Sequence, residues 1–517
     1  MNVIETTLER AGRQLTDWLS PRRIEIISTH LLVGSLLLLY FLTIVPNHNE
    51  ETYLQLSKQF YDPTWIENAF NLSEFAGTRV LYQYLMGFLL SFLSFEVLVL
   101  VGHAVFAIAF TFPLTKLYRT LELSNGAVLL HLAVLFLGHQ SMVGGGIMLL
   151  SLEPKTFAYF LVLYAVTFFV QGRYAWMVGA LLGASYFHIL VGGYAFLYLG
   201  GTVALFDAHP WRNRLLLVAA YGLGILPFMW YLSTAVSAPV VTTPSADWIY
   251  TYFRNPHHAA LFQSLIYFYR NHFYGVVMAA ITLVASIALV PSLSDPKIKR
   301  LNYFLILSLT GVLLAVVGAY FDTTGQFVKY YPFRINALST FVATLLAGYV
   351  FQQAIGERYR AWAHAGVVLL SAFFTLRALL PNAYLSYQYL SGANASFDAM
   401  CAYISEHTDR SDVILFVGEP TDELAEIDGD VSLIRKTRRS RFASFLFVPA
   451  QLSKLPGWYQ RVRLKQAIYD DLRVLPQAAA EYRIDYLLTT RDSTAVAELP
   501  VQRVKVIPPY TLYKINR

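Results

Sequence analysis

The first candidate for chemistry is a pair of adjacent carboxylates, Glu50 and Glu51, which closely follow an apolar segment and have His48 just before them. A carboxylate can take the proton of an attacking hydroxyl group, and carboxylate oxygens with an imidazole nitrogen can hold a divalent metal ion. The same residues also suit the first turn of a solvated helix capped by Asn49, because acidic side chains are stabilised at a helix N-terminus. These residues alone leave both interpretations open.

A second candidate is the pair Glu153 and Lys155, which flank Pro154 at the start of a long apolar segment. Proline fits the first turn of a helix, so this sequence predicts a helix that begins here. Ionisable groups at membrane depth are costly and are often functional, whereas at the membrane boundary they often mark only the interface. Both interpretations apply to this pair.

Basic residues form two further candidates. Arg254 offers a planar fork that fits a phosphate, and His257 and His258 beside it can bind a metal or donate hydrogen bonds to an anion. Lys329 and Arg334 precede a later apolar segment. Arg334 either extends toward lipid head groups or binds a lipid phosphate through two parallel hydrogen bonds.

Long apolar segments must position these residues. Hydrophobic residues make up 56% of the 517 residues and charged residues only 14%, whereas soluble domains carry about a quarter charged residues. A membrane-spanning helix needs about 20 mainly apolar residues, and runs of this length exclude an outer-membrane barrel. We therefore predict a polytopic α-helical membrane protein with about eleven spans, at 27–45, 96–115, 124–141, 147–170, 174–189, 191–206, 214–233, 273–292, 301–320, 333–352 and 361–380.

The distribution of basic residues predicts how the chain is oriented in the membrane. With eleven spans and a cytoplasmic N-terminus, the cytoplasmic gaps hold most of the basic residues, as expected for an inner membrane protein. These are Arg10, Arg13, Arg22, Arg23, Lys116, Arg119, Arg173, Arg212, Arg214, Lys297, Lys299, Arg300, Arg358 and Arg360. Counting the short apolar segment Val80–Ser94 as a span would move most of them outside. We therefore interpret it as an interfacial helix.

The chain is predicted to have three parts. Residues 1–23 form a cytoplasmic amphipathic N-terminus, and residues 24–380 form the membrane domain, with external loops 46–79 and 234–272. Residues 381–517 form a small periplasmic α/β domain, because short apolar runs such as Val413–Val417 alternate with helical patterns such as Ser396–His407. The basic run 435–441 in this part suits a solvated face, or a surface that holds the membrane or a phosphorylated substrate.

The net charge of +6 does not indicate a nucleic-acid partner. No basic helix or zinc-ligand spacing accompanies it, and basic loops that face anionic lipids account for it.

This arrangement resembles the GT-C superfamily of membrane glycosyltransferases. The shared features are the acidic pair after the first span (Glu50 and Glu51), a Glu-Pro start of a later span (Glu153 and Pro154), a basic residue at the outer end of a late span (Arg334) and an external C-terminal domain. The stretch from Arg254 to His258 is similar to one in an uncharacterised bacterial branch. Many members have aspartate in the first-loop pair, so the Glu-Glu pair leaves open which carboxylate is the base.

The resemblance implies a function at the external face of a bacterial inner membrane. A sugar would move from a polyprenyl-phosphate donor to a saccharide, lipid or protein acceptor by an inverting displacement. Glu50 or Glu51 would deprotonate the acceptor. Glu153, Lys155, Arg254, His257, His258, Lys329 and Arg334 would bind the lipid phosphate. A divalent cation, Mg²⁺ or Mn²⁺, is a candidate cofactor, with Glu50, Glu51 and His48 as candidate ligands.

Two other classes of function compete with this one. A flippase or polymerase of lipid-linked saccharides would also be polytopic and arginine-bearing, but it would place charges in the middle of the bundle. A non-catalytic scaffold for polysaccharide assembly would need no catalytic carboxylate.

Overall fold

The computed structural model describes residues 27–70, 72, 77–137, 140–149, 151–234, 242–355, 357–418, 431–449 and 451–516. The predicted amphipathic segment 1–23 lies outside these residues. The chain divides into two compact units. Unit 1 comprises 1–43, 100–228 and 255–383, and unit 2 comprises 44–99, 229–254 and 384–517. The helices α6 (Phe95–Thr120), α11 (Trp211–Thr234) and α17 (Glu357–Leu390) contribute to both units.

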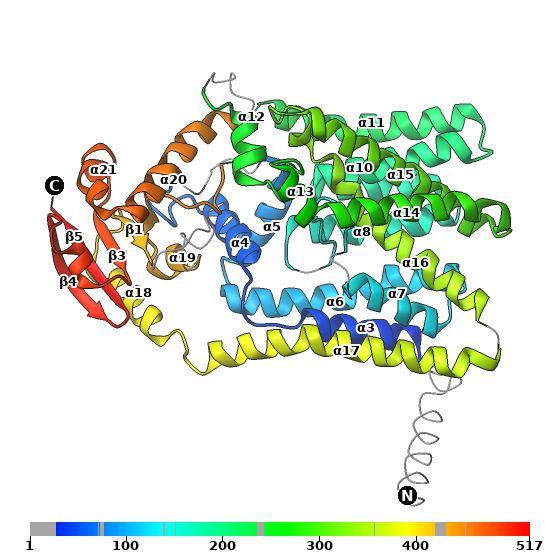
Figure 1. The fold of residues 1–517 in the computed structure, drawn as a ribbon, viewed down its shortest axis with the longest axis horizontal. Coiled ribbons are helices and arrows are strands. Elements are labelled where there is room, and N and C mark those ends of the chain that lie inside the picture. Colours follow the sequence, from blue (N-terminus) through cyan, green and yellow to red (C-terminus); the bar gives the residue numbers. More distant parts are fainter. Residues whose placement is uncertain are drawn as a thin grey trace, which may run out of the picture. The chain divides into compact units, whose positions relative to one another are not determined.

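Unit 1 is a bundle of apolar helices, most of which run in a similar direction (Figure 1). Besides parts of α6, α11 and α17, its elements are α3 (Thr29–Phe41), α7 (Asn125–Leu137), α8 (Pro154–Val170), α9 (Tyr174–Phe187), α10 (Ile189–Phe206), α13 (Leu265–Asn271), α14 (Phe273–Leu289), η3 (Val290–Ser292), α15 (Pro296–Phe321), η4 (Val328–Tyr330), η5 (Pro332–Ile335) and α16 (Asn336–Ala354).

Seven helices in the described part of the chain are long and apolar enough to cross a membrane, which supports the membrane assignment. They are Phe95–Thr120, Ile189–Phe206, Trp211–Thr234, Phe273–Ser292, Pro296–Phe321, Val328–Ala354 and Ala365–Leu390. Four shorter apolar helices, Thr29–Phe41, Asn125–Phe136, Pro154–Val170 and Tyr174–Phe187, lie where four further spans are predicted. The total of about eleven spans therefore stays a prediction.

Unit 2 joins the C-terminal region to the first predicted loop. Its elements before the C-terminal region are α4 (His48–Tyr61), η1 (Gly77–Arg79), α5 (Val80–Leu89), α12 (Ala246–Trp248) and the π-helical turn η2 (Ile249–Arg254). The helix α5 has ten residues and is about 15 Å long, half the thickness of a bilayer core. This length agrees with the interfacial assignment of Val80–Ser94, which stays a prediction.

The C-terminal region of unit 2 contains a five-stranded sheet of order β2-β1-β3-β5-β4. Strand β1 pairs in parallel with β2 and β3, and β5 pairs antiparallel with β3 and β4. The elements are α18 (Ala395–His407), β1 (Val413–Val417), α19 (Leu433–Thr437), β2 (Ser440–Arg441), η7 (Leu452–Lys454), α20 (Leu455–Asp470), η8 (Leu472–Val474), α21 (Leu475–Glu481), β3 (Tyr486–Thr489), η9 (Ser493–Val496), β4 (Val501–Ile507) and β5 (Tyr510–Ile515).

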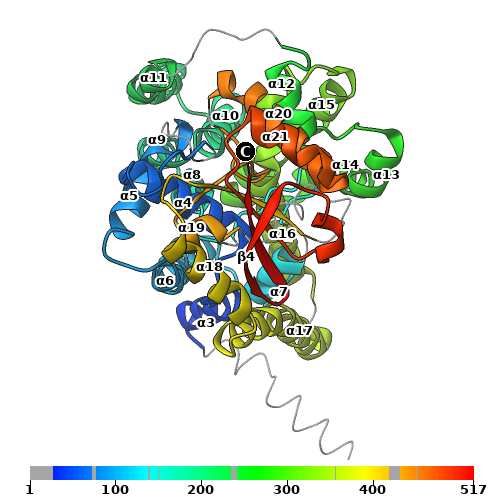
Figure 2. The same ribbon diagram turned by 90° about the vertical axis from the view of Figure 1, so that its left-hand side faces the viewer.

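Helices cover both faces of this sheet. Successive side chains of a strand point to opposite faces, so the residues of β1 divide between two cores. Val413, Leu415 and Val417 pack with Trp458 and the rest of the α20–α21 side. Ile414 and Phe416 pack against α18 and α19. Figure 2 shows these two helix pairs on either side of the strands. The small mixed α/β fold predicted for the tail is therefore present.

Candidate functional site

The predicted site residues fall into both units. Lys155, Glu153, His257, His258, Lys329 and Arg334 belong to unit 1, whereas His48, Glu50, Glu51 and Arg254 belong to unit 2.

His258 is the centre of a group of basic side chains in unit 1. Its ring lies 4.0 Å from that of His257, centroid to centroid, and meets the ring of Tyr331 edge to face. The guanidinium of Arg334 lies over the ring of Tyr331, 5.3 Å from its centroid. We call Lys155, His257, His258 and Arg334 the basic cluster, because the other three act electrostatically on His258.

The imidazole of His258 is held in its neutral form. Burial lowers its pKa well below the usual value, and the charges of Arg334 and Lys155 and the nearby His257 lower it further. Its Nδ1 lies 3.0 Å from the carbonyl oxygen of Gly144, which can only accept, so Nδ1 carries the proton. His258 therefore presents the lone pair of Nε2, and the positive charge of the cluster comes from Arg334 and Lys155.

This protonation state predicts how stability changes with pH. The unfolded chain takes up a proton at His258 near pH 6.5, whereas the folded chain does not, so folding loses stability as the pH falls. Relative to His258→Gln, the wild-type protein should lose about 1.4 kcal/mol between pH 7.5 and 5.5. Thermal unfolding in detergent at both pH values measures this. A stability difference that stays constant between the two pH values would contradict the neutral state of His258.

The loop between α7 and α8 positions His258 of the basic cluster. The side-chain oxygen of Asn336 accepts hydrogen bonds from the amides of Met142 and Val143 at 2.6 and 2.9 Å. Gly144 has a φ of +76°, which favours glycine, and a Cβ there would lie 2.6 Å from Cβ of Phe333. The loop thus fixes the carbonyl group that orients His258.

Two residues next to Arg334 were not singled out from the sequence. Tyr331 adopts a left-handed conformation with φ of 50°, which costs a non-glycine residue about 1–3 kcal/mol. It places a buried ring beside both His258 and Arg334. Asn336 is fully buried. The Gly144-Gly145-Gly146 run was a sequence signal for this loop.

Glu153 and Lys155 form an ion pair at the start of α8. Pro154 occupies the first helical position, as predicted, and Glu153 is the N-cap residue, without a hydrogen bond from its side chain to the first turn. The Nζ atom of Lys155 lies 3.0 Å from Oε2 of Glu153, and Ser151 donates a hydrogen bond to Oε1. Glu153 is 2% exposed. Lys155 thus neutralises a buried carboxylate, because an unpaired charge is costly in a low-dielectric region.

Lys329 lies in the short helix η4, before the segment that carries Arg334. Its ammonium group sits 5.4 Å from the ring of Tyr330, and the backbone carbonyl of Tyr330 accepts a hydrogen bond from Tyr194.

A long cavity of about 920 Å³ follows α14 in unit 1. We call it the α14 groove. Its lining is mainly apolar, and it extends from Arg270, Asn271 and Ser141 at one end to Leu289 and Val350 at the other. Other lining residues include Val134, Met142, Met278, Ile281, Thr282, Ala285, Asn302, Thr340, Ala343, Thr344 and Ala347. Ser141 and Met142 thus line the groove from the same loop whose Gly144 contacts His258.

In unit 2, Glu50 and Glu51 occupy the first turn of α4. The cap is Asn47 rather than the expected Asn49: its side chain accepts from the amides of Asn49 and Glu50, and the carboxylate of Glu50 accepts from the amide of Asn47. Glu50 is fully buried, so the turn is not the solvated one considered from the sequence.

Glu51 is engaged by Arg435 of α19. The guanidinium donates to both oxygens of Glu51, at 2.6 to 3.2 Å, and to Glu96 at 2.7 Å. Gln55 donates a further bond to Glu51. Burial tends to lower the pKa of Arg435, but the charges of Glu51 and Glu96 raise it above its usual value. We call Glu51, Glu96 and Arg435 the buried ion triad.

Arg254 packs inside unit 2. Its guanidinium lies 4.8 Å from the ring of Phe445 and donates to the carbonyl of Leu446 at 3.5 Å. The structure thus groups it with the C-terminal region, although it is only a few residues from His257 in sequence.

No arrangement suited to a metal ion appears among the described His, Cys, Asp and Glu side chains, taken in groups of three or more. His48, predicted as a ligand with Glu50 and Glu51, is exposed at the first position of α4. No family model matches this sequence, and no curated protein matches it.

Proposed function

We propose that this chain is a membrane glycosyltransferase that uses a polyprenyl-phosphate sugar donor. The observation that carries the proposal is that one loop, between α7 and α8, both contacts the basic cluster and lines the α14 groove. Ser141 and Met142 line the groove, and Gly144 accepts the hydrogen bond of His258. A group of basic side chains therefore adjoins a long apolar cavity within one unit.

The basic cluster suits the phosphate of such a donor. Arg334 is half-buried, and a guanidinium can bind two phosphate oxygens at once. The ammonium of Lys155 is 13% exposed and already paired with Glu153, so it contributes less charge. Neutral His258 is suited to accept a hydrogen bond from a sugar or phosphate hydroxyl, and this replaces the charge-stabilising role expected from the sequence.

The α14 groove suits the lipid chain of the donor. The helix α14 has 17 residues and is about 26 Å long, close to the thickness of the hydrocarbon core. The groove follows its whole length, from Asn271 to Leu289. Its volume is at the upper end of the range for ligand pockets. An extended isoprenoid chain would replace water along this apolar lining.

In the proposed reaction the acceptor oxygen forms a bond to the anomeric carbon as the bond from that carbon to the phosphate oxygen breaks. The lipid phosphate leaves with the electron pair, and Arg334 stabilises its charge. The acceptor proton goes to a carboxylate. The resemblance assigns this role to Glu50 or Glu51. Both carboxylates accept hydrogen bonds in the structure, Glu50 from the amide of Asn47 and Glu51 from Arg435 and Gln55, so the assignment rests on the sequence.

Release of polyprenyl phosphate from a radiolabelled polyprenyl-phosphate sugar, in vesicles with acceptor-containing membrane extract, tests the proposal. The wild-type chain should release it, and Glu50→Gln or Glu51→Gln should slow release about 10²–10⁴-fold, the usual effect of losing a general base. Glu67→Gln is the matched control, because Glu67 is an exposed acid of the same loop.

Three results would contradict the proposal. No release by the wild-type chain would remove the transferase assignment, and full release by both Glu50→Gln and Glu51→Gln would remove this pair as the base. Movement of intact donor across the vesicle membrane, with no bond cleaved, would favour the flippase instead.

A further inference from the structure

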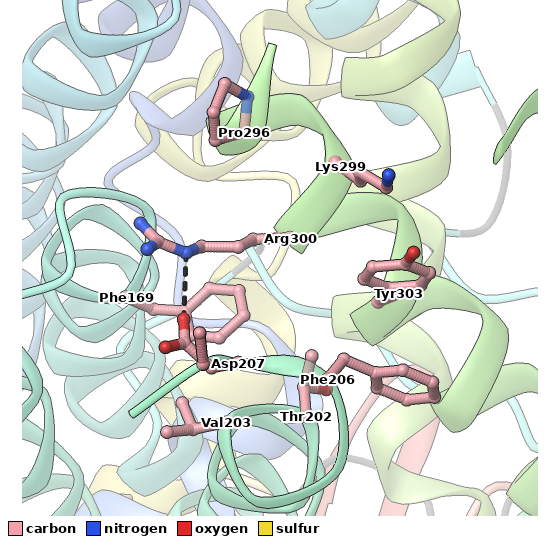
Figure 3. A pocket seen from close by; sticks show the side chains of 10 residues that line it. Phe169, Thr202, Val203, Phe206, Asp207, Pro296, Lys299, Arg300 and Tyr303 are labelled. Carbon is pink, nitrogen blue, oxygen red and sulfur yellow. Dashed lines mark hydrogen bonds and ion pairs between the residues drawn. The ribbon is translucent and has the colours of Figure 1, made fainter. Parts of the chain in front are cut away.

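A second cavity lies at the other end of unit 1, where α10 ends and α15 begins. It has a volume of about 310 Å³, and we call it the α10–α15 pocket. Phe169, Phe206, Asp207, Lys299, Arg300 and Tyr303 line it (Figure 3). No residue of the proposed glycosyltransferase site belongs to this pocket.

The two sites are at opposite ends of α15. Lys299 and Arg300 are in the first turns of this 26-residue helix, and the segment that carries Arg334 follows its last residue. The helix is about 39 Å long, which exceeds the hydrocarbon thickness of a membrane. The pocket therefore lies near the membrane surface that the charge distribution assigns to the cytoplasm.

Arg300, one of the two cations of the pocket, pairs with the carboxylate of Asp207. This carboxylate accepts from Nε of Arg300 at 3.1 Å, from the amide of His209 at 3.1 Å and from the hydroxyl of Tyr174. Arg300 also donates to the carbonyl of Val170 at 3.1 Å. Figure 3 shows Arg300 and Asp207 joined on one side of the pocket.

Lys299 is the second cation of the pocket lining. Its ammonium lies 6.0 Å from the ring of Tyr303, and within the described chain it forms no ion pair. The pocket lining thus carries two cations and one carboxylate, a net charge of one positive unit. A ligand that fills the pocket is expected to be an anion.

The apolar part of the lining indicates what kind of anion. Phe206 and Tyr303 stack with their centroids 4.6 Å apart, and Phe206 is 45% exposed at the surface of the bundle. Aromatic rings at this level are typical of the membrane–water interface, where lipid head groups meet their chains. Basic pockets between spanning helices on the cytoplasmic side bind anionic lipid head groups.

We propose that the α10–α15 pocket binds the phosphate head group of an anionic membrane phospholipid. Lys299 contacts the phosphate, and the Phe206–Tyr303 pair packs against the glycerol and the first part of an acyl chain. This site is independent of the proposed sugar transfer, so either proposal can fail while the other stands.

Lipid binding by the purified full chain in detergent, followed by native mass spectrometry and by thermal unfolding, tests this proposal. Phosphatidylglycerol should bind and raise the melting temperature, whereas phosphatidylcholine and inorganic phosphate at equal concentration should not. Lys299→Gln should weaken binding of phosphatidylglycerol about tenfold, as expected for a lost charge-assisted hydrogen bond. Lys299→Arg keeps the charge and should bind nearly as the wild type does.

Lys116→Gln is the matched control. Lys116 is a partly buried cation near the end of α6 that packs over Tyr164 and Phe168, outside the pocket. It is at the same end of the bundle, because the next turn of α6 contacts Lys297 of α15. Equal loss in Lys116→Gln and Lys299→Gln would show general attraction to anionic lipid and overturn the site. An equal shift with inorganic phosphate would overturn the lipid assignment.

Discussion

Replacing Arg334 with glutamine is expected to lower kcat/KM for a polyprenyl-phosphate sugar about 10²–10³-fold. Among the cluster residues, only Arg334 combines a permanent charge with no carboxylate partner in the described part of the chain. The loss of one positioned donor at a developing negative charge costs about 2.7–4 kcal/mol. Most of the loss should appear in kcat, because the phosphate gains charge as it leaves. Steady-state release of polyprenyl phosphate measures both constants.

Lys329→Gln is the control for this variant. It removes a cation from the same segment, but one that contacts Tyr330. Its effect should stay below about threefold, as for a surface charge worth well under 1 kcal/mol. Arg334→Lys should recover only part of the activity, because an ammonium lacks the planar fork. If Lys329→Gln were the more damaging of the two glutamine variants, the assignment of Arg334 to the phosphate would be wrong.

Replacing Arg435 with glutamine is expected to destabilise the protein by about 3–5 kcal/mol. This change leaves Glu51 and Glu96 of the buried ion triad without their shared cation, and an unpaired buried charge costs that much. The side chains of Glu51, Arg435 and Glu96 are 8%, 14% and 25% exposed, so water relieves little of the cost at Glu51 and more of it at Glu96. The apparent melting temperature in detergent should fall clearly, with loss of α4 protection in hydrogen exchange.

Lys436→Gln removes the neighbouring cation and serves as the matched control. Its partner Asp398 is 51% exposed, and such pairs are worth about 0–1 kcal/mol. Adding Glu51→Gln and Glu96→Gln to the Arg435→Gln variant should restore part of the stability, because no buried charge then stays unpaired. Equal melting temperatures for Arg435→Gln and Lys436→Gln would mean that the triad does not stabilise the fold.

Much of the fold could be predicted from hydrophobic patterns. Each apolar segment predicted as a span coincides with an apolar helix, and the strands at 413–417 and 510–515 form as expected. Strand β4 was missed because its burial pattern is irregular and mostly exposed, as befits an edge strand. The grouping of residues 44–99 with the tail was also missed, because it depends on contacts between residues far apart in sequence, such as Glu51 and Arg435.

The sequence predicted which side chains are unusual better than it predicted their partners. The run 435–441 looked like a solvated or anion-binding face, yet Arg439 is 4% exposed and donates to the carbonyls of Ser405 and Thr408. A run of basic residues in the sequence does not show which carbonyl and carboxylate groups accept hydrogen bonds from their side chains. Likewise, no sequence pattern shows that Tyr331 has a positive φ or that His258 is neutral, because both follow from tertiary packing.

The position of a bound polyprenyl phosphate in an experimental density map tests the central claim most directly. The full chain would be purified in lipid nanodiscs with an excess of polyprenyl phosphate, beside a sample without it. The proposal predicts a phosphate within hydrogen-bonding distance of Arg334 and an extended chain along α14 between Asn271 and Leu289. A phosphate bound away from the basic cluster, or an α14 groove that stays free of the chain while the lipid binds elsewhere, would contradict it.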